Sequence, residues 1–107
     1  MHTKCSRTNE ELTAMLDEEL SQPDYDQLPK YMLPAVYQYV VDGRPPGTFL
    51  EAVITNNLRH ALTCADDRNL KVLPVWVRFF YNCVPAACVG DAHDMTNWMR
   101  ERGNTDV

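Results

Sequence analysis

The sequence predicts an all-α protein, a compact bundle of four main helices with an additional acidic N-terminal helix. Apolar residues recur at the three- and four-residue spacings of amphipathic helices along most of the chain. Proline and glycine separate these segments, and alternating strand-like sequence is scarce. A chain of 107 residues can bury one modest core. We therefore expect an acidic N-terminal helix and linker in residues 1–27 and a helical core domain in residues 28–107.

Two helices are expected before the first glycine. In the first, residues 9–21, Thr8 and Glu11 have the spacing of a capping box. The second covers residues 29–42, starts among prolines and ends at Gly43, which suits the left-handed position after a helix. The apolar stripes are Leu12, Met15, Leu16 and Leu20 in the first helix, and Met32, Val36, Tyr39 and Val40 in the second.

The third expected helix runs without interruption over residues 49–65. Asn57 falls on its apolar stripe. A buried amide needs hydrogen-bond partners, because an unpaired one costs about 1–3 kcal/mol. We expect Asn57 to clamp this helix to the next one by bonding a backbone carbonyl that Pro74 leaves free. Asn56 falls on a neighbouring row with His60 and is expected to reach a partner.

The fourth expected helix, residues 68–82, is the most apolar and should be central, with a kink or a restart at Pro74. The last helix is expected to start at Asp91, where Asp94 has capping-box spacing, and to end at Gly103. Its apolar face consists of Met95, Trp98 and Met99.

The net charge of −5 lies entirely in residues 1–26, which hold two bases and seven acids. The remaining residues hold eight of each. The lack of a basic stripe argues against nucleic-acid binding, and no apolar run approaches the roughly 20 residues that span a bilayer. We expect a cytoplasmic protein without membrane contact. The acidic segment is either a solvated helix face or a surface for a basic partner.

Residues 28–100 contain "PPGTFLEAVITNNLRHALTCADDRN", "LPVWVRFFYNCVP" and a later "NW" pair, in a fairly specific order. Over this region the chain resembles a group of short, mostly uncharacterised proteins encoded by bacteriophages and prophages. The resemblance implies a small all-helical accessory protein, which would act in the host cytoplasm if it is phage-encoded. No activity is established for this group, so the resemblance implies no particular activity for this chain.

Polar side chains gather around the third expected helix and at the end of the fourth. The residues assigned a structural polar role are Asn57, Asp66, Asp67, Asn69, Tyr81 and Asn82. Arginine suits phosphates and carboxylates because its donors form a planar fork, and an aromatic side chain outside a small core suits an interface. The residues expected to bind a partner or ligand are Arg44, Asn56, Arg59, His60, Arg68 and Trp98.

The sequence contains residues for one conceivable metal site and no catalytic motif. His60 and Cys64 stand four apart on one helix and, with Cys83 and Cys88 or His93, would make a conceivable tetrahedral zinc site. However, no C-x-x-C pair exists, and free cysteine commonly packs as a small hydrophobe. The sequence has no nucleophile elbow or phosphate-binding loop. We expect no enzymatic activity, cofactor or metal.

The leading hypothesis is a phage- or prophage-type accessory protein that binds and modulates a host protein, most simply by inhibiting it. A host defence component is a specific case. The first alternative is a small-molecule binder whose arginines sequester an anionic or nucleotide-type signal. The second alternative is a zinc-stabilised regulator. An exposed apolar face on the last helix would also suit a homodimer.

Overall fold

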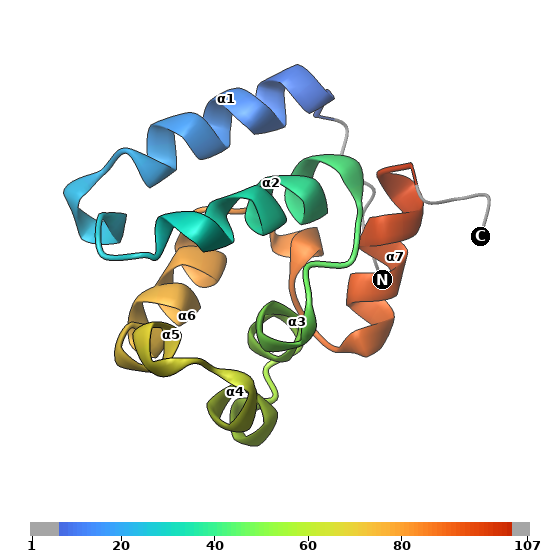
Figure 1. The fold of residues 1–107 in the computed structure, drawn as a ribbon. Coiled ribbons are helices and arrows are strands. Elements are labelled where there is room, and N and C mark those ends of the chain that lie inside the picture. Colours follow the sequence, from blue (N-terminus) through green and yellow to red (C-terminus); the bar gives the residue numbers. More distant parts are fainter. Residues whose placement is uncertain (1–6, 104–107) are drawn as a thin grey trace.

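A computed structural model describes residues 7–103, which form seven α-helices and no strand; the all-α prediction is confirmed. The helices are α1 (Asn9–Leu20), α2 (Leu33–Asp42), α3 (Thr48–Ile54), α4 (Leu58–Cys64), α5 (Asp67–Lys71), α6 (Leu73–Asn82) and α7 (Ala92–Glu101). Figure 1 shows α1 and α2 side by side, with α4 at the opposite end of the molecule. The expected bundle of four main helices differs from this arrangement, because the third and fourth expected helices are each divided in two.

The acidic helix α1 contributes to the common core. Thr8 and Glu11 form the expected capping box: the Glu11 backbone N–H donates to Thr8 Oγ1 at 3.1 Å, and the Thr8 N–H donates to Glu11 Oε1 at 2.8 Å. Leu12 and Leu16 are fully buried where α1 packs on α2. Removing α1 would therefore expose core side chains of the rest of the chain.

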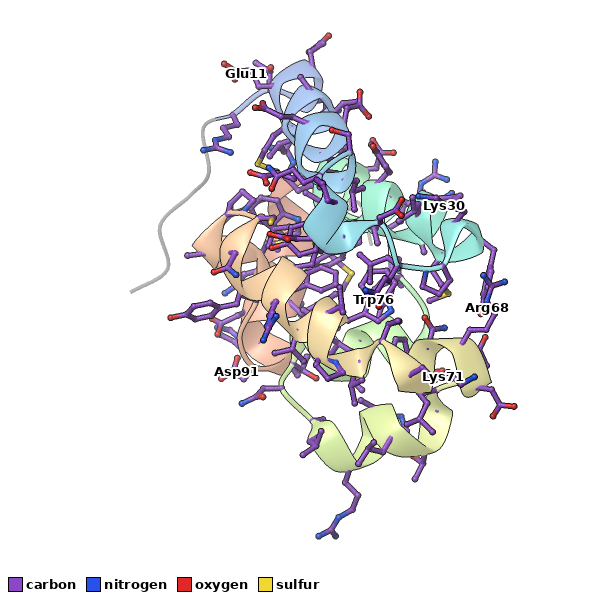
Figure 2. The ribbon with its side chains drawn as sticks, turned by 90° about the vertical axis from the view of Figure 1, so that its left-hand side faces the viewer. Glu11, Lys30, Arg68, Lys71, Trp76 and Asp91 are labelled. Carbon is purple, nitrogen blue, oxygen red and sulfur yellow. The ribbon has the colours of Figure 1, made fainter. Side chains whose placement is uncertain are left out.

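The centre of the core is aromatic. Trp76 of α6 is fully buried, and its ring centroid lies 6.1–6.4 Å from those of Phe49, Phe79 and Phe80. Figure 2 shows Trp76 inside the molecule. Its indole N–H donates to Asn69 Oδ1 at 2.9 Å, and the Asn69 side chain is itself buried. This bond joins α5 to α6 and satisfies both polar groups.

The third expected helix is broken at the two asparagines. Asn56 has a left-handed backbone with φ 60°. Its N–H donates to Val53 O at 3.2 Å, and the next N–H, of Asn57, donates to Ala52 O at 2.7 Å. These two bonds form a Schellman motif, which ends α3, and asparagine is one of the few residues that tolerate its left-handed position. Asn57 then caps α4, because its Oδ1 accepts the His60 backbone N–H at 3.2 Å.

The expectation that Asn57 is a buried clamp is therefore wrong. Its side chain is exposed and bonds within its own helix start. Pro74 occupies the second position of α6, where a helix uses no backbone N–H, so it leaves no carbonyl unpaired. The expected restart at Pro74 is confirmed, with Val72 between α5 and α6.

Asn57→Ala should lower the free energy of unfolding by about 1 kcal/mol, because the amide N–H groups at the start of α4 lose their cap. Asn57→Asp should keep most of the stability, since a carboxylate is an equally good cap. Urea denaturation of both variants measures the difference. Equal stability of Asn57→Ala and the parent protein would show that α4 does not begin with this cap.

Helix α7 packs closely on the end of α2. Gly43 is left-handed with φ 73°, as expected, and a Cβ there would lie only 2.6 Å from Met99 O. Trp98 is fully buried, and its indole N–H donates to Tyr39 O at 3.1 Å. The expectation that Trp98 is an exposed partner-binding residue is wrong, because the apolar face of α7 points towards α2. Trp98 is a core residue.

Helix α7 begins with the expected capping box. The Asp94 backbone N–H donates to Asp91 Oδ1 at 2.9 Å and lowers the pKa of Asp91. Because this pKa is lower in the folded than in the unfolded chain, the stability that Asp91 contributes is present above about pH 4 and is lost as the pH falls further. Asp91→Asn keeps an oxygen that can cap the helix but removes the carboxyl group that titrates. Between about pH 6 and pH 3, its urea midpoint should therefore fall less than that of the parent protein. An equal fall of the urea midpoint in the two proteins would contradict the assignment of this pH dependence to Asp91.

Candidate partner-binding site

Large apolar side chains remain exposed on α4 and α6: Leu58 (62%), Leu62 (46%), Val77 (51%) and Tyr81 (84%). Single exposed apolar residues are ordinary, but three of these four, Leu58, Val77 and Tyr81, line two adjoining hollows. A pocket of about 280 Å³ is lined by Val53, Ile54, Asn56, Val77, Phe80, Tyr81, Val89 and Gly90. A smaller hollow next to it shares Val53, Asn56 and Val77 and extends to Leu58. We call this surface the α4–α6 groove, defined by Val53, Asn56, Leu58, Val77, Tyr81 and Val89.

The helix break at the asparagines shapes this groove. The turn at Asn56 ends α3, and α4 follows as a separate helix (Figure 1). Residues of α4 and of α6 then line the smaller hollow from two sides. At the other end of the groove, the Gly90 N–H donates to Ile54 O at 3.1 Å and holds the segment before α7 against the end of α3. A continuous third helix would not provide the side that α4 forms.

The lining of the groove suits contact rather than catalysis. The polar side chains that line the two hollows are the amides of Asn56 and Asn57 and the phenol of Tyr81, and no carboxylate, imidazole or thiol is among the lining residues. The Asn57 amide caps α4, which leaves two polar side chains for a bound molecule, those of Asn56 and Tyr81. Among residues 7–103, neither of these two side chains has a hydrogen-bond partner. A bound molecule would therefore meet an apolar surface with one free amide and one free hydroxyl.

The other residues expected to bind a partner are spread over three segments. Arg59 follows Leu58 on α4 and is exposed. Arg44 lies in the loop after α2, and the guanidinium of Arg68 on α5 lies 5.4 Å from the centroid of the Tyr31 ring. Neither Arg44 nor Arg68 lines the groove. Of this set, only Asn56 lines the groove.

The residues expected to have a structural role divide into two groups. Asp66 caps α5 by accepting the Asn69 N–H at 2.8 Å, and it also accepts the Tyr31 hydroxyl. The Tyr31 bond lowers the pKa of Asp66 and raises that of Tyr31. Tyr81, in contrast, is almost fully exposed, and its hydroxyl has no hydrogen bond within residues 7–103 that would support the structural role expected of it. Asp67 and Asn82 are also exposed.

The candidate zinc ligands do not form one cluster. His60 is exposed, and its Nε2 lies 3.4 Å from Cys64 Sγ. Cys83 and Cys88 are buried. In the part of the chain that the structure describes, no three His, Cys, Asp or Glu residues are placed to hold a metal ion. The tetrahedral arrangement that the spacing suggested does not form.

No protein-family model, curated protein or solved structure matches the chain. The resemblance to phage-encoded proteins therefore stays a prediction from the sequence. None of the helices in residues 7–103 is long and apolar enough to cross a membrane.

The sequence-based reasoning missed the main residues of the groove. The continuous helices expected over residues 49–65 and 68–82 would place Val53, Leu58 and Val77 on apolar faces, and therefore in the core. The available signal was the pair of adjacent asparagines, since asparagine is favoured both at left-handed helix ends and at helix starts.

Proposed function

We propose that the protein is a non-catalytic binding protein that docks a segment of a partner protein in the α4–α6 groove. The observation that supports this most strongly is a set of three exposed apolar side chains on adjoining hollows: Val77 and Tyr81 line the larger one, and Leu58 lines the smaller one. Removing apolar area from water drives most protein association, and tyrosine is enriched among the residues that dominate binding energy. Tyr81 is the most exposed of the three.

The partner is, in this proposal, a host protein in the cytoplasm, and binding inhibits it. A host defence component is the specific case. This part of the proposal rests on the resemblance to phage-encoded proteins, whereas the location of the binding surface rests on the groove.

An anionic small molecule is the second candidate, and the groove favours it less. The arginines that motivated it do not converge on the groove. The pocket of about 280 Å³ is apolar and small in comparison with the roughly 300–1,000 Å³ of typical ligand sites. A polypeptide side chain fits such a hollow better than a phosphorylated ligand does.

Site-specific photo-cross-linking tests where a partner binds. The photoreactive amino acid p-benzoylphenylalanine is placed at position 81 in the groove, at position 31 as a second exposed tyrosine, and at position 14 on α1. Each full-length variant is illuminated in a lysate of the organism in which the protein acts. We expect a covalent partner adduct from position 81 and none from positions 31 and 14.

The other results would each change the proposal. An adduct from position 14 alone would move the binding surface to the acidic face of α1. Adducts from position 31 alone, or from all three positions alike, would contradict binding in the groove. The acidic face of α1 would then be tested by substituting its acidic residues. Deletion of residues 1–26 is unsuitable, because α1 carries two fully buried leucines.

A further inference from the structure

We infer that His60 and Cys64 form half of a zinc site, which a second copy of this chain completes. Two copies related by a two-fold axis would supply two imidazoles and two thiolates to one ion, a common ligand set of structural zinc sites. The inference goes beyond the proposed function, because neither residue lines the α4–α6 groove. It depends on the geometry of the pair, its exposure and the place of α4 in the fold.

The two side chains lie on the same side of α4 and approach each other. They are four residues apart, so they come from successive turns of the helix. Cys64 Sγ lies 3.4 Å from Nε2 and 3.8 Å from Nδ1 of the His60 ring. In a tetrahedral site, a Zn–N bond of about 2.0 Å and a Zn–S bond of about 2.3 Å place nitrogen and sulfur about 3.5 Å apart. The observed separation therefore matches that of two ligands of one zinc ion, and rotation of the exposed ring aims a nitrogen lone pair at the metal.

Both ligand atoms are available to an ion. His60 is exposed, and Cys64 is a half-buried free thiol. Among residues 7–103, the polar contacts of these two side chains are only with each other. Metal binding would therefore break no other hydrogen bond or ion pair of the two side chains. The thiol would lose its proton to solvent as the Zn–S bond forms, because the thiolate is the form that binds metals.

One chain does not fill the coordination sphere of the ion. Structural zinc sites take four protein ligands. Within residues 7–103, however, no group of three His, Cys, Asp or Glu residues is placed to hold a metal ion. A second copy would provide the missing imidazole and thiolate. Since both copies present the same pair, the two-fold contact is self-complementary.

The position of α4 allows two copies to approach each other. Figure 1 shows α4 at the end of the molecule opposite α1. Helix α1 holds five acidic residues and no base: Glu10, Glu11, Asp17, Glu18 and Glu19. A contact through α4 therefore keeps the two acidic helices of a dimer apart, whereas a contact through α1 would bring like charges together.

Sedimentation velocity and cobalt spectroscopy of the full-length chain test the inference. The protein is reduced, stripped of metal with EDTA, transferred to chelator-free buffer, and measured alone, with zinc chloride and with cobalt chloride. We expect a monomer without metal and a dimer that holds one zinc ion for every two chains. Cobalt should give the visible absorption of a tetrahedral site together with a thiolate charge-transfer band.

Variants of the two ligands and two matched controls locate the site. Zinc-dependent dimerisation and the cobalt spectrum should be lost in His60→Ala and in Cys64→Ser. Both should be kept in His93→Ala and Cys5→Ser, which remove a histidine and a cysteine elsewhere in the chain. Circular dichroism checks that each variant folds, and His60→Ala decides if Cys64→Ser does not, because His60 is exposed. A dimer that needs no metal, one zinc ion per chain without dimerisation, or an unchanged response of His60→Ala would overturn the inference.

Discussion

Trp98→Ala should lower the free energy of unfolding by about 3–5 kcal/mol, the usual cost of removing a buried tryptophan. The side chain has no exposed area, and it fills the contact between α7 and α2. Its loss would also leave Tyr39 O without the indole N–H that it accepts at 3.1 Å. Since domains of this size are stable by only about 5–15 kcal/mol, the variant should lie near the limit of folding.

Trp98→Phe separates the two contributions. Phenylalanine keeps most of the packing but cannot donate a hydrogen bond to Tyr39 O. The free energy of unfolding should therefore fall clearly less than for alanine. Urea denaturation followed by circular dichroism measures both variants. If Trp98→Ala kept its full stability but lost binding to a partner, Trp98 would be a surface residue and the packing of α7 described above would be wrong.

Gly43→Ala should lower the free energy of unfolding by about 2–5 kcal/mol, because two costs add. A side chain at φ 73° costs about 1–2 kcal/mol for residues other than glycine. In addition, the new Cβ would lie 2.6 Å from Met99 O and 2.8 Å from Arg102 Cβ, so α7 would have to shift. Such overpacking typically costs about 1–3 kcal/mol.

Gly43→Asn distinguishes backbone strain from the close approach of α7. Asparagine tolerates the left-handed conformation but carries the same Cβ, so only the packing cost should remain. Thermal and urea denaturation of the two variants give the comparison. If Gly43→Asn were as stable as the parent, α7 would not pack against this glycine, and the conformational requirement alone would explain the residue.

Helix ends with a local chemical signal could be predicted from the sequence. The capping boxes at Thr8 and Asp91 and the left-handed Gly43 lie where the sequence placed them. Each depends on a few adjacent residues, because a capping side chain bonds a backbone group only three residues away. The restart of the chain at Pro74 was predictable for the same reason.

The break at Asn56 and Asn57 was not predicted, because apolar periodicity continues across it. Periodicity gives the side-chain direction only while the backbone stays helical. One left-handed residue resets that direction, so Asn57 and Leu58 point to solvent where a continuous helix would bury them. The reverse error concerned Trp98: only the tertiary packing of α7 on α2 decides that this tryptophan is covered.

The candidate site was predicted only in part for the same physical reason. Asn56 belongs to the expected set and lines the groove. Val77 and Tyr81 acquire their role from the position of α4 opposite α6, which no local spacing encodes. A groove between short helices is a tertiary property, and the sequence reports it only indirectly, through the pair of asparagines that separates those helices.

Isothermal titration of the partner identified by cross-linking at position 81 tests the central claim most directly. The titrated proteins are the parent, Val77→Asp in the groove, and Leu70→Asp, a similarly exposed apolar position outside it. If the α4–α6 groove is the binding site, Val77→Asp should weaken the affinity at least about tenfold. Leu70→Asp should change it less than about twofold, within the effect of a peripheral charge. Equal losses for both variants, or an unchanged affinity for Val77→Asp, would contradict binding in the groove.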